Sequence, residues 1–118
     1  MKTILVVDDA MFMRKTIRLI LEKNGYQVVG EASNGLEAVS MYEELQPDIV
    51  TMDLTMPEMD GISATKAIHS SHPNSTVVIV SAMGQDSYVR EAIMAGARAF
   101  IVKPFQESYV LETLRKIS

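Results

Sequence analysis

Cysteine is absent from all 118 positions of this chain, and this absence excludes several classes of site at once. The chain has no disulfide framework, no thiolate metal site and no cysteine nucleophile. Basic residues are in the minority, with 11 Lys and Arg against 15 Asp and Glu, and the formal net charge is -4. General binding to nucleic acid or to a membrane surface requires a basic excess, so we expect neither as a partner.

Long apolar runs and low-complexity tracts are also missing from the sequence. No apolar stretch approaches the roughly 20 residues of a membrane-spanning helix, and the amino terminus lacks the features of a signal peptide. Apolar residues nevertheless make up 47% of the chain, which is enough to build a hydrophobic core. The length suits one domain over residues 1–118, and we expect a cytoplasmic monomer.

Five short runs of mostly apolar residues predict buried β-strands at residues 4–7, 27–30, 49–52, 77–80 and 99–102. The segments between these runs have helical periodicity. Asn34 with Glu37 three residues later predicts a helix start, and Asp86 or Ser87 is expected to cap a fourth helix whose inner face includes Ile93. Strands that alternate with helices predict an α/β fold, with one doubly wound parallel sheet covered on both faces.

Polar residues with the chemistry of a binding site follow the first, third, fourth and fifth predicted strands. The carboxyl ends of parallel strands meet at one edge of the sheet, which is where open α/β folds bind ligands. The residues expected to meet there are Asp8 and Asp9 after the first strand, Asp53 after the third, Ser81 after the fourth and Lys103 after the fifth.

Three carboxylates at one edge of a sheet repel one another. Each pair at about 4 Å costs roughly 4 kcal/mol at an effective dielectric constant near 20, which is more than one lysine offsets. The site therefore requires a further cation, and oxygen ligands without His or Cys select a hard ion such as Mg²⁺. Acids, Mg²⁺, a lysine and a hydroxyl together favour phosphoryl transfer, in which one Asp is the nucleophile.

The motifs at these strand ends resemble the receiver domain of two-component response regulators, and the resemblance spans the whole chain. It is carried by residues 6–9 (VVDD), 52–61 (MDLTMPEMDG), 81–82 (SA) and 102–104 (VKP). Residues 9–14, 81–85 and 100–106 are similar to the chemotaxis members of that family in particular. The resemblance implies a flavodoxin-like fold with strand order 2-1-3-4-5.

The resemblance also implies a role for each matching residue. Asp53 would be the phosphoacceptor; Asp8, Asp9, Asp53 and the main-chain carbonyl of Thr55 would hold Mg²⁺; Lys103 would pair with the phosphoryl group; and Ser81 and Phe100 would respond to it. The protein would then be a phosphoacceptor switch rather than an enzyme, although it takes part in its own phosphorylation and dephosphorylation. The implied partners are a histidine kinase of the chemotaxis (CheA) type, the flagellar motor switch protein and a phosphatase.

Three alternative functions share some of these features. A phosphorelay intermediate, or a receiver cut from a larger regulator, would use the same site. An Mg²⁺-dependent aspartyl-phosphate hydrolase of the haloacid dehalogenase type needs a second acid two residues after the nucleophile, where this chain has Thr55. A flavin carrier on the same fold needs a hydroxyl- and glycine-rich phosphate loop after the first strand, where Asp8 and Asp9 would repel the phosphate.

Two pairs of polar residues are left without an assigned role. Arg14 and Arg18 are four residues apart on one helix face, which suits either a solvated stripe or a docking patch for an acidic partner. His69 and His72 have no acid or third ligand at metal spacing, so we interpret them as solvated surface residues.

Overall fold

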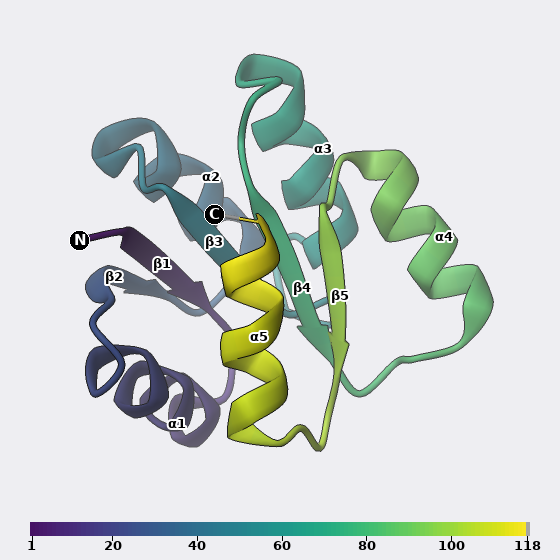
Figure 1. Cartoon of the computed structure of the whole chain (residues 1–118). Coiled ribbons are helices and arrows are strands. Elements are labelled where there is room, and N and C mark those ends of the chain that lie inside the picture. Colours follow the sequence, from purple (N-terminus) through teal and green to yellow (C-terminus); the bar gives the residue numbers. More distant parts are fainter. Residues whose placement is uncertain (118) are drawn as a thin grey trace.

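The computed structural model describes residues 1–117 and contains five strands that alternate with five helices (Figure 1). The elements in chain order are β1 (Thr3–Val7), α1 (Met11–Glu22), β2 (Gln27–Ala32), α2 (Gly35–Leu45), β3 (Ile49–Met52), α3 (Gly61–Ser71), β4 (Val77–Ser81), α4 (Asp86–Ala95), β5 (Ala99–Val102) and α5 (Glu107–Ile117). The predicted alternation is confirmed, and the second strand extends two residues beyond its prediction. None of the helices in the described part of the chain is long and apolar enough to cross a membrane.

All five strands are parallel and form one sheet in the order β2-β1-β3-β4-β5, which confirms the predicted fold class. The register places the last residue of β1, Val7, beside Met52 at the end of β3. Ser81 at the end of β4 lies beside Val102 at the end of β5. The residues that follow these strands are therefore brought to one edge of the sheet.

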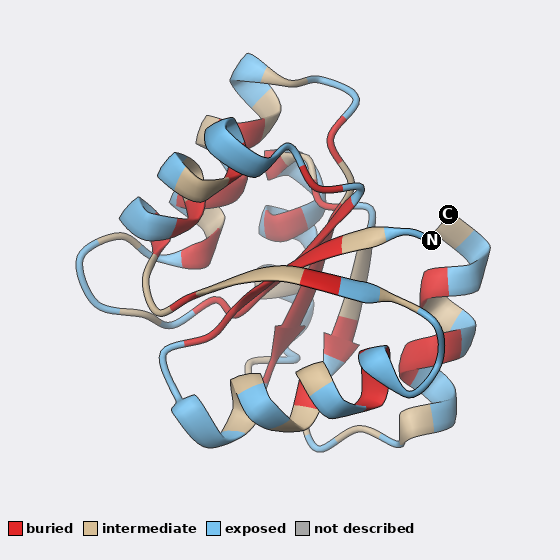
Figure 2. Ribbon diagram, turned by 90° about the vertical axis from the view of Figure 1, so that its left-hand side faces the viewer, coloured by how far each residue is buried: buried red, intermediate tan, exposed pale blue. Residues whose placement is uncertain are grey.

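Helices cover both faces of the sheet, as Figure 1 shows. Helices α2, α3 and α4 pack on one face through residues such as Ala38, Ile68 and Ala92. Helices α1 and α5 pack on the other face through residues such as Leu21 and Leu114. The central strands are buried on both sides (Figure 2). The polar residues that follow them are therefore attached to closely packed parts of the chain.

Helix α2 begins as predicted, whereas α4 does not. Asn34 is the N-cap of α2, and its side chain accepts a hydrogen bond from the Glu37 backbone N–H at 2.9 Å. In α4 the N-cap is Gln85, without a side-chain cap, so the expected cap at Asp86 or Ser87 is wrong. Ile93 is 48% exposed rather than on the inner face, because the small residues of α4 face α3 and the sheet instead.

The loop from β3 to α3 doubles back closely on the end of its own strand. The Gly61 backbone N–H donates to the Leu54 carbonyl at 2.8 Å. A side chain at this position would collide with the Asp53 carbonyl oxygen, so only glycine allows this approach. Gly61 thereby fixes the backbone directly after β3.

One buried hydroxyl in the sheet is unpaired. Thr51 in β3 is 1% exposed, lies between Val6 of β1 and Val78 of β4, and its Oγ1 has no hydrogen-bond partner among the described residues. A buried polar group without a partner is destabilising. We therefore expect Thr51→Val to raise the free energy of unfolding by about 1 kcal/mol, measured by urea denaturation.

Thr65 provides the matched control for this substitution. It is equally buried, but its hydroxyl donates to the Gly61 carbonyl at 2.7 Å. Thr65→Val removes a satisfied hydrogen bond and should lower the free energy of unfolding by about 0.5–1.5 kcal/mol. A loss of stability in Thr51→Val as large as that in Thr65→Val would show that the Thr51 hydroxyl is not an unpaired group.

Candidate functional site

Asp8 follows β1 and is held from several directions. Its backbone N–H donates to the Ala32 carbonyl at 3.0 Å, which continues the pairing of β1 with β2. Its Oδ1 accepts from the Ala10 N–H at 2.9 Å, and its Oδ2 lies 2.7 Å from the Lys103 ammonium. With 1% exposure, Asp8 is a buried carboxylate with an ion-pair partner.

Asp53 follows β3 and lies at the centre of the carboxyl edge. Its N–H donates to the Val7 carbonyl at 3.0 Å, and its Oδ1 accepts from the Leu54 N–H at 2.8 Å. Its Oδ2 lies 3.7 Å from the Lys103 Nζ. Lys103 therefore lies beside the carboxylates of both Asp8 and Asp53.

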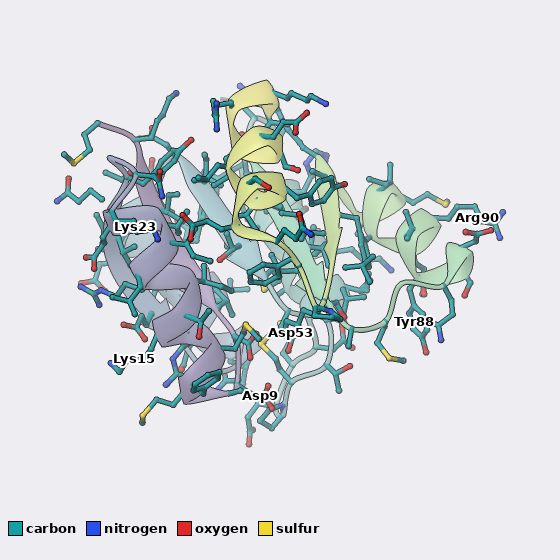
Figure 3. All side chains as sticks on the ribbon, turned by 60° about the horizontal axis from the view of Figure 1, so that its bottom comes forward. Asp9, Lys15, Lys23, Asp53, Tyr88 and Arg90 are labelled. Carbon is teal, nitrogen blue, oxygen red and sulfur yellow. The ribbon has the colours of Figure 1, made fainter. Side chains whose placement is uncertain are left out.

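Asp9 completes a group of three acids. Each of Asp8, Asp9 and Asp53 offers a carboxylate oxygen, and these oxygens lie within 4.8 Å of one another. Asp9 is exposed, and Figure 3 shows it beside Asp53 below the strand ends. The donors are all oxygens and together carry more negative charge than Lys103 neutralises, so they fit a hard divalent cation.

Ser81 and Phe100 lie on the two neighbouring strands β4 and β5. Ser81 is buried at the end of β4, and its Oγ accepts a hydrogen bond from the Met83 N–H at 3.1 Å. Phe100, on β5, is half-buried and packs partly against the hydrophobic core. It also lines an open groove of about 360 Å³ together with Val102 and Tyr109.

Thr55 lies in the loop after Asp53 and is exposed. It lines a second cleft of about 360 Å³, which extends from this loop along α3 and α4 and also includes Met83. The structure thus brings Asp8, Asp9, Asp53, Ser81 and Lys103 to one edge of the sheet, with Thr55 in the adjoining loop.

Of the remaining polar pairs, His72 and the two arginines have structural partners, whereas His69 Nδ1 is buried and has no hydrogen-bond partner within residues 1–117. His72 Nε2 lies 2.7 Å from Glu43 Oε1, and its ring contacts Tyr42. Neither His72 nor His69 belongs to the acidic group.

Arg14 and Arg18 both pair with an acid of this chain; the Arg14 side chain is 14% exposed, and the Arg18 side chain is 40% exposed. Arg14 Nε lies 3.2 Å from Glu31 Oε1, and Arg18 Nη1 lies 2.7 Å from Glu31 Oε2. Arg14 Nη1 also donates to the Asp8 carbonyl at 2.7 Å. The pairing of both arginines with Glu31 was not predicted from the sequence, because only the β1–β2 pairing brings Glu31 next to α1.

Burial raises the pKa of Asp53 above its ordinary value of 3.8, and the Asp8 and Asp9 carboxylates act in the same direction. The Lys103 ammonium and the Leu54 N–H oppose them, but the net shift of the Asp53 pKa is upward. The folded protein therefore binds the Asp53 proton more tightly than the unfolded chain does. Stability is lost as the pH rises from 3.8 through the folded-state pKa, so the ionised carboxylate is destabilising at neutral pH.

We therefore expect Asp53→Asn to raise the melting temperature in metal-free buffer at pH 7.5. The gain should shrink as the pH falls toward 4, because the carboxyl group is then protonated in the folded protein. Each kcal/mol gained corresponds to roughly 4 °C in a domain of this size. Thermal unfolding at the two pH values is the measurement, and an equal gain at both would contradict the assigned cause.

Asp48 provides a control of opposite sign. The Thr3 backbone N–H at 2.8 Å and the Thr3 hydroxyl at 3.1 Å lower the pKa of Asp48. Its carboxylate adds stability above its unfolded-state pKa, and this is lost as the pH falls. Asp48→Asn should therefore lower the melting temperature at pH 7.5.

Comparison with known proteins agrees with this geometry. The family model for the response regulator receiver domain matches residues 4–115. Chemotaxis protein CheY of Thermotoga maritima is 59% identical over 99% of this chain and 98% of its own length. CheY of Bacillus subtilis is 58% identical over 96% of this chain and 94% of its own.

Solved structures give the same result. The CheX-CheY-BeF3-Mg²⁺ complex from Borrelia burgdorferi contains a chain that superposes with a TM-score of 0.96 at 36% identity, covering 98% of this chain and 88% of that one. The response regulator domain of Thermotoga maritima CheB superposes with a TM-score of 0.88 at 38% identity, covering 98% and 92% of the two chains. The strand order, the acidic edge and these matches together show that the chain belongs to the response regulator receiver domain family and is CheY-like.

Proposed function

We propose that the chain is a chemotaxis response regulator that is phosphorylated on Asp53 by a histidine kinase in the presence of Mg²⁺. The single observation that carries the proposal is the position of the Asp53 carboxylate. It lies beside two further carboxylates, with one oxygen of each of the three acids within 4.8 Å of the others, and it is 3.7 Å from a lysine ammonium. The high identity to chemotaxis proteins over nearly the whole chain supports the chemotaxis role.

In the proposed transfer, an Asp53 carboxylate oxygen attacks the phosphorus of a phosphohistidine. The new O–P bond forms as the P–N bond breaks, and the departing imidazole takes a proton from solvent. Lys103 lies close enough to Asp53 to pair with the transferred phosphoryl oxygens. Its present contact with Asp8 at 2.7 Å shows that its ammonium already faces the site.

Asp8, Asp9 and Asp53 would hold the Mg²⁺ together with the main-chain carbonyl of Thr55. When bound, the ion supplies the positive charge that a phosphoryl group requires beside three carboxylates. These residues hold oxygen donors at one edge, and three carboxylates there face the single ammonium of Lys103, which supports the proposed cation site.

The phosphoryl group would be sensed through Ser81. Its hydroxyl now accepts from the Met83 N–H, and it would rotate to donate to a phosphoryl oxygen. A hydrogen bond to a charged group is worth roughly 1.5–3 kcal/mol, enough to shift a two-state population by about 10- to 150-fold. Movement of the β4–α4 loop would make room for Phe100 to turn inward.

Phe100 connects this change to an exposed surface on α4, β5 and α5. Phe100 lines the groove with Val102 and Tyr109, which are 45% and 52% exposed. Ile93 on α4 is also exposed. An inward turn of the ring would reshape the groove. The proposed reader of this surface is the flagellar motor switch protein, in the cytoplasm.

A phosphatase is the third proposed partner. The Borrelia burgdorferi relative is known as a complex of CheX with CheY, beryllium fluoride and Mg²⁺. Its chain is 36% identical to this one and has the same fold, which supports an equivalent partner here.

Phosphorylation is tested by mass spectrometry after incubation with acetyl phosphate and Mg²⁺. We expect one added phosphate in the unaltered chain, and none in Asp53→Asn or in the presence of EDTA, because the nucleophile or the metal is then missing. Asp48→Asn, which removes an acid outside the site, should be labelled normally. Undiminished labelling of Asp53→Asn would refute the assignment of the phosphoacceptor.

The switch is tested by titrating the motor switch protein with and without beryllium fluoride as the phosphoryl mimic. Ser81→Ala should still be phosphorylated on Asp53 but lose most of the gain in affinity, about 10-fold or more. Phe100→Ala should reduce the same gain, whereas Ser40→Ala on the exposed side of α2 should leave it intact. A full gain in Ser81→Ala would show that the signal does not pass through this hydroxyl.

A further inference from the structure

Arg14, on α1, connects the acidic edge to strand β2. Its Nη1 donates to the Asp8 carbonyl at 2.7 Å, and its Nε pairs with Glu31 of β2 at 3.2 Å. The Arg14 side chain is only 14% exposed, so both contacts are shielded from solvent. We propose that Arg14 is a positioning residue for the magnesium site, which fixes the Asp8–Asp9 peptide and thereby the direction of the Asp9 carboxylate.

The Asp8 carbonyl depends on Arg14 because the sheet no longer pairs it. Asp8 is the first residue beyond β1. The preceding carbonyl, that of Val7, still accepts a hydrogen bond from the N–H of Asp53, the residue after β3. Among the hydrogen bonds of residues 1–117, the one from Arg14 is the bond that the Asp8 carbonyl accepts. A carbonyl at a strand end is thus oriented by a charged side chain instead of a neighbouring strand.

The two acids differ in how they are held. The Asp8 carboxylate has its own anchors, the Ala10 N–H at 2.9 Å and Lys103 at 2.7 Å, and does not need Arg14. Asp9 is exposed, and its carboxylate accepts no hydrogen bond within the described part of the chain. The direction of the Asp9 side chain therefore depends on the orientation of the peptide that precedes it, and this is the peptide that Arg14 holds.

Glu31 in turn holds Arg14. The hydrogen bond from Arg18 lowers the pKa of Glu31, and the bond from Arg14 acts in the same direction, so Glu31 stays ionised at neutral pH. The planar guanidinium of Arg14 reaches Glu31 with Nε and the Asp8 carbonyl with Nη1. A lysine has a single nitrogen and cannot make both contacts in this fixed geometry. The edge strand β2 is thereby linked to the metal site through α1.

The charge and the geometry of Arg14 act on Mg²⁺ in opposite directions. As a nearby cation, Arg14 repels the metal ion, so loss of its charge alone would tighten binding. As a positioning residue, it keeps Asp9 aimed at the site, so loss of its contacts weakens binding. Removal of a residue that orients a metal ligand typically costs 10- to 100-fold in affinity. The sign of the change therefore distinguishes the two effects.

The experiment is a calorimetric titration of the metal-free protein with Mg²⁺. We expect Arg14→Gln to weaken Mg²⁺ binding by about 10-fold or more and to shift the Asp9 backbone amide resonance, while the fold persists. Glu31→Gln, which leaves Arg14 without its anchor, should weaken binding in the same direction by a smaller factor. Arg14→Lys should restore only part of the affinity, because it keeps the charge without the double contact.

Lys15→Gln is the charge-matched control. Lys15 is the next residue of α1, is exposed, and points away from the acidic group in Figure 3. The substitution Lys15→Gln removes one positive charge from the same helix and no contact with Asp8, so Mg²⁺ binding should be unchanged or slightly tighter. Melting temperatures in metal-free buffer separate a general loss of stability from the loss of affinity.

The inference rests on the proposed function, and the outcomes separate the two. Unchanged or tighter Mg²⁺ binding by Arg14→Gln, with binding intact in the unaltered chain, would overturn the positioning role and leave the proposed function standing. Absence of Mg²⁺ binding in the unaltered chain would overturn both. If Arg14→Gln does not fold, the Mg²⁺ titration of Glu31→Gln takes its place. A Mg²⁺ affinity of Glu31→Gln equal to that of the unaltered chain would then overturn the inference.

Discussion

The removal of closely spaced carboxylates from water is the constraint on which the rest of this structure depends. Asp8 and Asp53 are buried beside each other, and Lys103 is the ammonium that contacts both. Burial raises the pKa of Asp53, the Asp8 and Asp9 carboxylates act in the same direction, and the ionised Asp53 carboxylate is therefore destabilising at neutral pH. An acidic edge of this kind persists only because the surrounding sheet holds it together.

The sheet provides this support through burial on both of its faces. Strands β1 and β3 lie in the middle of the order β2-β1-β3-β4-β5, and the two sets of helices cover them from either side. Hydrogen bonds such as that from the Asp53 N–H to the Val7 carbonyl continue the sheet into the site. The hydrophobic core thus offsets the electrostatic cost at its own edge.

The supports around the edge differ in strength, and this difference suits a switch. Asp8 is held by backbone and side-chain bonds, and Gly61 fixes the loop after Asp53 by its close approach. Ser81, in contrast, is held by one hydrogen bond at 3.1 Å, and Phe100 lies half-buried beside an open groove. In our proposal the rigid residues bind the phosphoryl group, and the loosely held residues report it.

Much of this protein was determined by its sequence alone. The apolar runs and the acids that end them predicted the parallel sheet and the meeting of Asp8, Asp9 and Asp53, because parallel strands place all their carboxyl ends at one edge. This reasoning uses only local patterns and one topological rule. The family resemblance added the strand order, and the sheet confirms it.

The tertiary structure decided what local patterns do not contain. Ile93 was expected to face inward, but α4 presents its small residues to its neighbours and leaves Ile93 exposed, since the rotation of a helix is set by the surface it packs on. The ion-pair partner of Arg14 and Arg18 could not be predicted from the sequence, because Glu31 approaches them only when β2 pairs with β1. Contacts between residues on different elements depend on strand order and register, and these are fixed only when the whole sheet forms.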